Sequence, residues 1–160
     1  MNKSNPIVFL LTLGSILSMF LFYACNNQVV FEKNKKIDTQ GWHYLEKVDF
    51  EFESQDTSAL YNIYLNVRNN RDYPYRNFIV FFQTHFPDGR IFTDTIEANL
   101  ARRSGQWTGE GFGNIKSNSF HFRRDVWFPE KGNYKFFIQH AMRNEYLPGI
   151  THIGIRIEEK

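Results

Sequence analysis

The side chains that could do acid–base or metal chemistry are few and widely spaced. Five histidines stand at positions 43, 85, 121, 140 and 152, and none forms a His-x-x-x-His or Glu-flanked pair of the kind that binds zinc. Glu51 and Glu53 would lie about 7 Å apart on one face of a strand, a separation that suits an inverting glycosidase. However, Asp and Glu alternating with Val and Phe are also typical of any solvated strand face. We therefore expect no catalytic residues and no metal site.

A glycine-rich stretch, SGQWTGEGFGN at residues 104–114, contains the other candidate motifs. Ser104 is not part of a Gly-x-Ser-x-Gly nucleophile elbow. The glycines at 109, 111 and 113 resemble a phosphate loop, but no helix follows them to bind a phosphate at its N-terminus. Two interpretations stay open: a bent strand whose glycines admit neighbouring aromatics, or a loop that presents Trp107 and Phe112 to a partner.

The only cysteine, Cys25, ends an apolar run. Lys3 precedes an uncharged segment from Ile7 to Ala24, which is typical of an export signal, although an uncleaved anchor or a free soluble form are alternatives. The sequence around Ala24-Cys25 is similar to a bacterial lipobox, with Phe22-Tyr23 departing from the usual small or aliphatic residues. We therefore expect a signal peptide over 1–24 and acyl chains such as palmitate on Cys25, which explains an unpaired cysteine in an exported protein.

Length and charge restrict the number of domains and the possible classes of function. The chain has 160 residues, which suggests one domain, and a net charge of +2, which argues against nucleic-acid binding. Residues 25–41 are polar and lysine-rich apart from Val29-Val30-Phe31, and they are interpreted as a tether with at most one short edge strand.

From Trp42 onward, apolar residues recur with period two, which predicts strands. In VDFEFE the residues Val48, Phe50 and Phe52 share one face, and Ile153, Ile155 and Ile157 do so near the C-terminus, with Glu158 outward. Phe78–Phe86 is apolar on both faces and predicts a central strand. Only residues 97–103 have modest helical character. We expect an all-β fold: one antiparallel β-sandwich, jelly-roll or immunoglobulin-like, of about 7–8 strands over 42–160, preceded by a signal helix, with a closed barrel as second choice.

An ordered set of short motifs resembles the gliding motility lipoprotein GldH family of the Bacteroidota. The motifs are Cys25, Asn69-Asn70, Tyr73-Pro74-Tyr75-Arg76-Asn77, Phe86-Pro87-Asp88-Gly89, Gly105-Gln106-Trp107-Thr108-Gly109 with Gly111 and Gly113, Phe128-Pro129 with Gly132 and Tyr134, Met142-Arg143, and Leu147-Pro148-Gly149-Ile150 with Gly154. They cover most of the chain after Cys25.

The resemblance implies a non-enzymatic envelope lipoprotein that supports gliding and the associated type IX secretion, with Cys25 as the lipid attachment point. It implies neither a cofactor nor a small-molecule substrate. Asn26-Asn27-Gln28 contains no acidic cluster of the surface-export kind, so we expect a domain tethered to the outer membrane and facing the periplasm.

Two functional classes remain. The first is a scaffold that contacts other envelope motility and secretion lipoproteins through Trp107, Phe112, Met142, Arg143 and Leu147. The second is a glycan-binding lipoprotein that stacks sugar rings on exposed aromatic side chains, for which Tyr44, Tyr73, Tyr75, Trp107 and Trp127 are the candidates. Aromatics aligned on one open face favour the second class, and aromatics packed inside favour the first.

Overall fold

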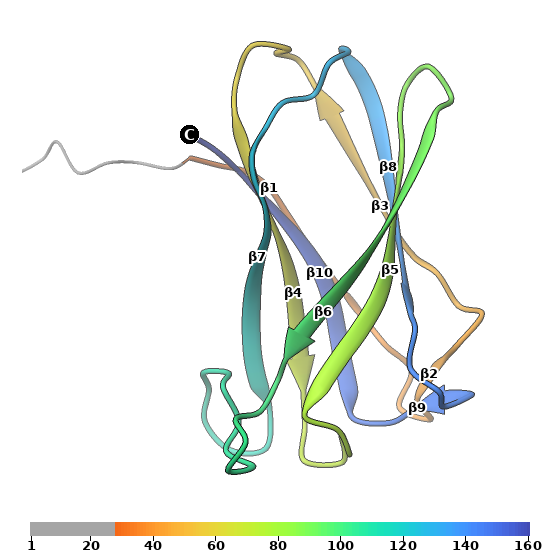
Figure 1. Ribbon diagram of the computed structural model, residues 1–160, viewed down its shortest axis with the longest axis vertical. Helices are drawn as coiled ribbons and strands as arrows, with labels where there is room; N and C mark the ends of the chain where they lie inside the picture. Colours follow the sequence, from red (N-terminus) through yellow and green to blue (C-terminus); the bar gives the residue numbers. More distant parts are fainter. Residues whose placement is uncertain (1–27) are drawn as a thin grey trace, which may run out of the picture.

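The computed structural model describes residues 28–160, and these fold into strands without a helix (Figure 1). The eight long strands are β1 (Gln28–Lys36), β3 (Val48–Ser54), β4 (Tyr61–Asn69), β5 (Asn77–His85), β6 (Ile91–Asn99), β7 (Lys116–Val126), β8 (Gly132–His140) and β10 (Ile150–Glu159). Two short strands, β2 (Trp42–His43) and β9 (Tyr146–Leu147), pair with each other. The expected signal helix lies outside the described residues.

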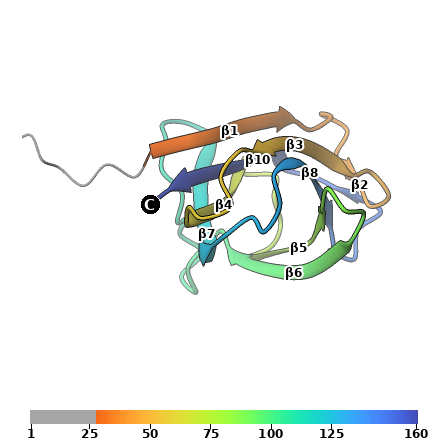
Figure 2. The same ribbon diagram turned by 90° about the horizontal axis from the view of Figure 1, so that it is seen from above.

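The long strands form two antiparallel sheets packed face to face. One sheet has the order β1-β10-β4-β7 and the other β3-β8-β5-β6, and Figure 2 shows the two layers from above. Counted along the chain, the long strands stand in the order 1-8-3-6 in one sheet and 2-7-4-5 in the other. This is the jelly-roll arrangement of two interlocked Greek keys. The expected antiparallel sandwich is confirmed, and of the two topologies considered it has the jelly-roll one.

The core lies between the sheets and follows the predicted alternation. Tyr134, Phe136 and Ile138 of β8 point inward, as do the four isoleucines of β10 and Phe50 of β3. Residues that alternate with them along β3 are exposed. Such an arrangement is what a sheet with one buried and one solvated face produces.

Four local expectations differ from the structure. Most of the expected tether is strand β1, which pairs with β10 from Gln28 to Lys36 although its side chains are almost all exposed. Glu158 is 3% exposed instead of facing solvent, because Arg156 covers and pairs with it. Strand β5 is central in its sheet as expected, but its outer face is not covered, since Phe81 is exposed. Residues 97–103 continue β6 and then turn, without helix.

The sandwich has two distinct ends. We call the end where β1 begins and β10 finishes the entry end, and the opposite one the far end. The connections 55–60, 86–90 and 127–131 lie at the entry end, at the top of Figure 1. The connections 37–47, 70–76, 100–115 and 141–149, together with β2 and β9, lie at the far end. All five expected partner residues come from segments of the far end.

Candidate functional site

The longest connection, residues 100–115, builds one side of the far end. Its base is ordered by backbone hydrogen bonds, from Thr108 N to Leu100 O at 2.9 Å and from Arg102 N to Gln106 O at 2.8 Å. Position 109 requires a glycine, because a Cβ there would lie 2.6 Å from Nδ2 of Asn118. The segment is therefore a folded loop against β7, and the close neighbours of Gly109 are Asn118 and Ser117, not aromatic rings. The presentation of Trp107 and Phe112 to a partner stays a prediction.

Trp107 and Phe112 have different environments in this loop. Trp107 is half-buried and packs against the core. Phe112 is 104% exposed, so its ring has no packing partner in the described part of the chain. Gly111 and Gly113 on either side have φ of +130° and +71°, a backbone conformation that favours glycine. The loop thus holds an aromatic ring out in solvent.

A second group of predicted residues lies on the other side of the far end. Met142 and Arg143 line a shallow cavity of about 360 Å³ together with Tyr44, Asn144 and Glu145. The Met142 sulfur accepts a hydrogen bond from Ile79 N at 3.4 Å, and the Tyr75 hydroxyl lies 2.5 Å from Oδ1 of Asn144. These contacts tie the segment to β5 and to the 70–76 connection.

An aromatic patch borders this cavity. We define the far-end patch as His43, Tyr44, Leu45 and Tyr146. The His43 ring lies between the other two rings, with centroids 4.9 Å from Tyr44 and 4.8 Å from Tyr146. Leu45 and both tyrosines are exposed. Leu45 and Tyr146 were not expected from the sequence, because Leu45 lies in the turn after β2 and Tyr146 in a two-residue strand, and neither segment shows a periodic pattern.

Leu147 cannot contact a partner. It is 0% exposed and belongs to the core, whereas its neighbour Tyr146 on β9 faces out. The pairing of Leu147 with the equally buried Trp42 explains this placement. The sequence hypothesis that Leu147 binds a partner is wrong for this reason, and the exposed side chain of the segment is Tyr146.

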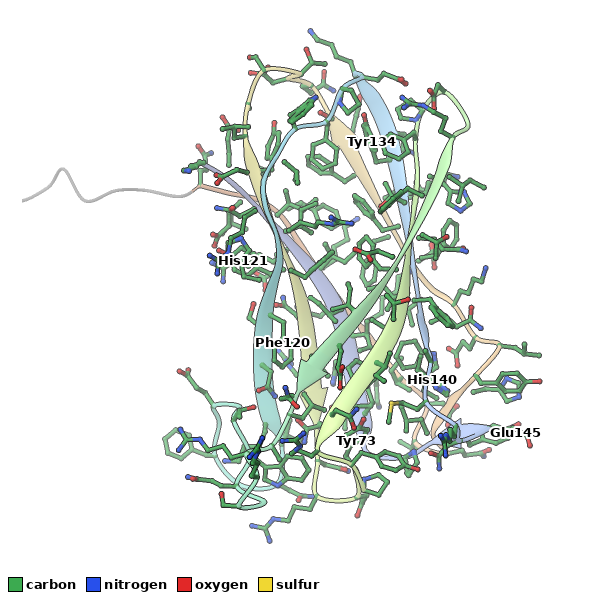
Figure 3. The ribbon with its side chains drawn as sticks, viewed as in Figure 1. Tyr73, Phe120, His121, Tyr134, His140 and Glu145 are labelled. Atoms are coloured by element: carbon green, nitrogen blue, oxygen red, sulfur yellow. The ribbon has the colours of Figure 1, made fainter. Side chains whose placement is uncertain are left out.

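His140 is a structural histidine. It lies inside the far end near β2 and β9 (Figure 3), with Nε2 2.9 Å from the backbone oxygen of Trp42. Burial lowers the pKa of His140, which keeps its ring neutral. Across residues 28–160 no three His, Cys, Asp or Glu side chains gather closely enough to hold a metal ion.

The outer face of the β1-β10-β4-β7 sheet has an open polar hollow of about 640 Å³. Its floor includes Asn66 and Arg156, and the loop residues 108–110 form one wall. Nδ2 of Asn66 donates to Glu32 at 3.1 Å, and Oδ1 of Asn66 accepts from Ser119 at 2.8 Å. The hollow combines residues of five strands distant in sequence and was not expected.

Beside the hollow, Tyr64 is sandwiched between two side chains. The His121 ring, which points outward from β7 in Figure 3, stacks on it with centroids 4.4 Å apart, and the Arg156 guanidinium lies 5.3 Å from its centroid. The ring faces of Tyr64 are thus occupied by the protein itself. The hollow offers hydrogen-bonding groups and no free aromatic platform.

The aromatics considered for glycan stacking do not share a face. Tyr73 is buried at the far end (Figure 3), while Tyr75 and Trp107 are half-buried. Tyr44 is exposed at the far end, and Trp127 is exposed just after β7 at the entry end. The arrangement matches the case in which most aromatics pack inside.

Cys25 lies outside the described residues. In residues 28–160 no helix has the length and apolar character needed to cross a bilayer.

The fold and the far end together define a jelly-roll β-sandwich domain with exposed loops and no clustered chemical centre in its described part. The model of the family described as GldH lipoprotein matches residues 29–157, so this chain belongs to the GldH lipoprotein family. The expected family is confirmed.

Two curated relatives match along nearly their whole length. The protein named gliding motility lipoprotein GldH homolog of Christiangramia forsetii is 35% identical over 151 residues, which cover 90% of this chain and 92% of the relative. Gliding motility lipoprotein GldH of Flavobacterium johnsoniae is 34% identical over 152 residues, which cover 91% and 94%.

Among solved structures, that of infectious bursal disease virus Gx strain matches with a TM-score of 0.32 at 11% identity, over 82% of this chain and 32% of that one. The coat protein of Tobacco streak virus matches with a TM-score of 0.28 at 7% identity, over 87% and 90%.

Proposed function

We propose that this protein is a non-enzymatic scaffold subunit of the gliding motility machinery and its associated type IX secretion. In this proposal, acyl chains on Cys25 hold it on the outer membrane, and the sandwich faces the periplasm. Membership of the GldH lipoprotein family and the names of its relatives support a motility-linked lipoprotein. The partners are other envelope lipoproteins of the same machinery.

One observation carries the scaffold role: Phe112 stands fully exposed on an ordered loop of the far end. A fully exposed aromatic ring removes a large apolar area from water when a partner covers it, and aromatic side chains dominate interface energetics. The far-end patch adds exposed Tyr44, Leu45 and Tyr146 at the same end. A partner that covers the far end would bury all of these groups.

Phe112→Ala is a sharper test than Trp107→Ala, because Trp107 also packs against the core. We expect Phe112→Ala to weaken co-purification with envelope lipoproteins and to reduce cell spreading, with unchanged unfolding midpoint. Glu51→Ala is the matched control, since Glu51 is exposed on the outer face of β3, away from the far-end loops. Equal effects of both substitutions would contradict the proposal.

Anchoring and orientation need separate measurements. Cells given a fatty-acid analogue should label the wild-type protein and fail to label Cys25→Ser. Protease added to intact cells should spare the domain if it faces the periplasm. Rapid digestion would instead assign it to the cell surface.

Glycan binding is the second candidate, and the polar hollow favours it. Amide, hydroxyl and guanidinium groups on one open face are suited to a neutral saccharide. In titrations with cell-envelope polysaccharides, Asn66→Ala should abolish binding while Phe112→Ala preserves it. If the wild-type protein shows neither a heat of binding nor any other sign of binding in these titrations, this candidate function is excluded.

A further inference from the structure

We propose that the entry end of the sandwich lies against the bilayer that carries the protein, with Trp127 seated at the level of the lipid headgroups. The partner of this surface is a lipid surface. The inference rests on the lipid at Cys25, which belongs to the proposed function, and on the geometry of residues that the structure describes.

The first step is the reach of the chain. Only Asn26 and Asn27 separate Cys25 from Gln28, the first residue of β1. An extended chain spans at most about 3.6 Å per residue, so the Cα atoms of Cys25 and Gln28 lie within about 11 Å of each other. A lipid on Cys25 therefore keeps the start of β1 close to the membrane surface, and the domain cannot move far away from it.

The second step connects Gln28 with Trp127. Gln28 pairs with Glu159, Glu159 with Tyr61, and Tyr61 with Val126, which makes one row across the sheet. With neighbouring strands about 4.8 Å apart, this row is about 15 Å long. Trp127 directly follows Val126, so it lies at the same end of the sandwich as the point where the lipid anchor enters.

The third step is the chemistry of this end. Trp127 is 62% exposed, and Val29 and Leu60 are exposed as well, with Leu60 O accepting a hydrogen bond from Lys160 N at 3.0 Å. Trp127 also borders an apolar groove of about 230 Å³ together with Phe92, which is exposed too. Tryptophan is enriched at membrane–water interfaces, because its large ring is apolar and its N–H needs a polar partner.

Charge does not explain the surface. Lys160 pairs with Asp125 at 2.7 Å, Arg90 with Glu130 at 2.7 Å, and Arg123 with Asp94 at 2.5 Å. These three pairs reduce the attraction to anionic lipid, although Arg124 and Lys131 at the same end are exposed and have no ion-pair partner among residues 28–160. The contact is apolar and aromatic, and we expect it on zwitterionic lipid as well.

The experiment uses the full lipidated protein in phosphatidylcholine vesicles whose acyl chains bear bromine, a contact quencher of tryptophan emission. The protein has three tryptophans, of which Trp42 is buried and Trp107 belongs to the far end. We expect quenching of the Trp127 share of the emission. Trp127→Phe should remove the quenching, and the matched control Trp107→Phe should retain it.

Hydrogen exchange gives a second readout that needs no substitution at Trp127. Amides of residues 55–60 and 127–131 should exchange more slowly on vesicles than in the unlipidated Cys25→Ser form, and those of 100–115 should not change. If Cys25 carries lipid and the protein floats with the vesicles, but quenching is absent or follows Trp107, the docking surface is refuted and the scaffold proposal stands. If Cys25 carries no lipid, both proposals are refuted.

Discussion

Gly149 offers a sharp test of how the far end is held together. It lies between β9 and β10 with a φ of +79° and packs against the backbone of Asp72 and Tyr73. A Cβ at this position would lie 2.5 Å from the Tyr73 Cα and 2.7 Å from the Asp72 carbonyl carbon. Asn70 N also donates to Gly149 O at 2.8 Å, so the two connections cannot separate without losing this hydrogen bond.

Gly105 is the matched control for Gly149→Ala. Its φ is +83°, but nothing lies within 4 Å of a Cβ built there. A non-glycine residue in this conformation costs about 1–2 kcal/mol, and the stiffer unfolded chain offsets roughly 0.4–1 kcal/mol of that. Gly105→Ala should therefore lower the free energy of unfolding by about 1 kcal/mol. Gly149→Ala adds overpacking of roughly 1–3 kcal/mol, giving about 2–4 kcal/mol in total.

Urea unfolding followed by tryptophan fluorescence measures both losses. With an m value of about 2 kcal/mol/M, the midpoint should fall by roughly 1–2 M for Gly149→Ala and by about 0.5 M for Gly105→Ala. Equal midpoints for the two variants would refute the reasoning, because they would mean that Tyr73 moves aside without cost.

Two further predictions concern the same end. Leu147→Ala should lower the free energy of unfolding by about 2–5 kcal/mol, as large-to-small core substitutions do. Arg143 is exposed, so Arg143→Ala should change it by less than about 0.5 kcal/mol. Denaturant unfolding of both variants measures this difference, and similar values would argue against a core position for Leu147. Because burial lowers the pKa of His140 below the ordinary 6.5, the unfolded chain binds a proton more readily and stability should fall as the pH drops through that value. When the pH is lowered from about 7.5 to about 5.5, the free energy of unfolding should fall less for His140→Gln than for the wild type. An identical pH dependence of the two proteins would exclude His140 as a contributor.

The sequence was sufficient where one face of a strand is buried and the other solvated. Phe50 and Phe52 on β3, and the isoleucines of β10, were placed correctly because burial imposes period two over several residues. The same logic failed for β1, whose side chains are nearly all exposed. That strand is held by backbone hydrogen bonds to β10, a partner more than a hundred residues away, and no local pattern encodes such pairing.

The candidate site was predicted less completely, again for a physical reason. Phe112 was identified because glycines on both sides of an aromatic residue indicate a loop. Leu147 was assigned to a partner although it belongs to the core, since β9 has two residues and gives no alternation to read. The polar hollow joins Glu32, Asn66 and Arg156 from three different strands. Only the three-dimensional order of the sheet brings them together.

The order of strands also determines which loops can carry function. Each long strand crosses the sandwich once, so a chain that enters at one end makes its first, third, fifth and seventh connections at the other. The four far-end connections have 7 to 16 residues, and the three entry-end connections have 5 or 6. In the proposed arrangement, the short turns leave a compact end that would fit against a planar bilayer, and the long loops supply the surface proposed to bind partners. Under the two proposals, a tether at the start of β1 gives the two ends opposite tasks. The same topology with a C-terminal anchor would also attach at the entry end, because Glu159 pairs in the row that begins at Gln28.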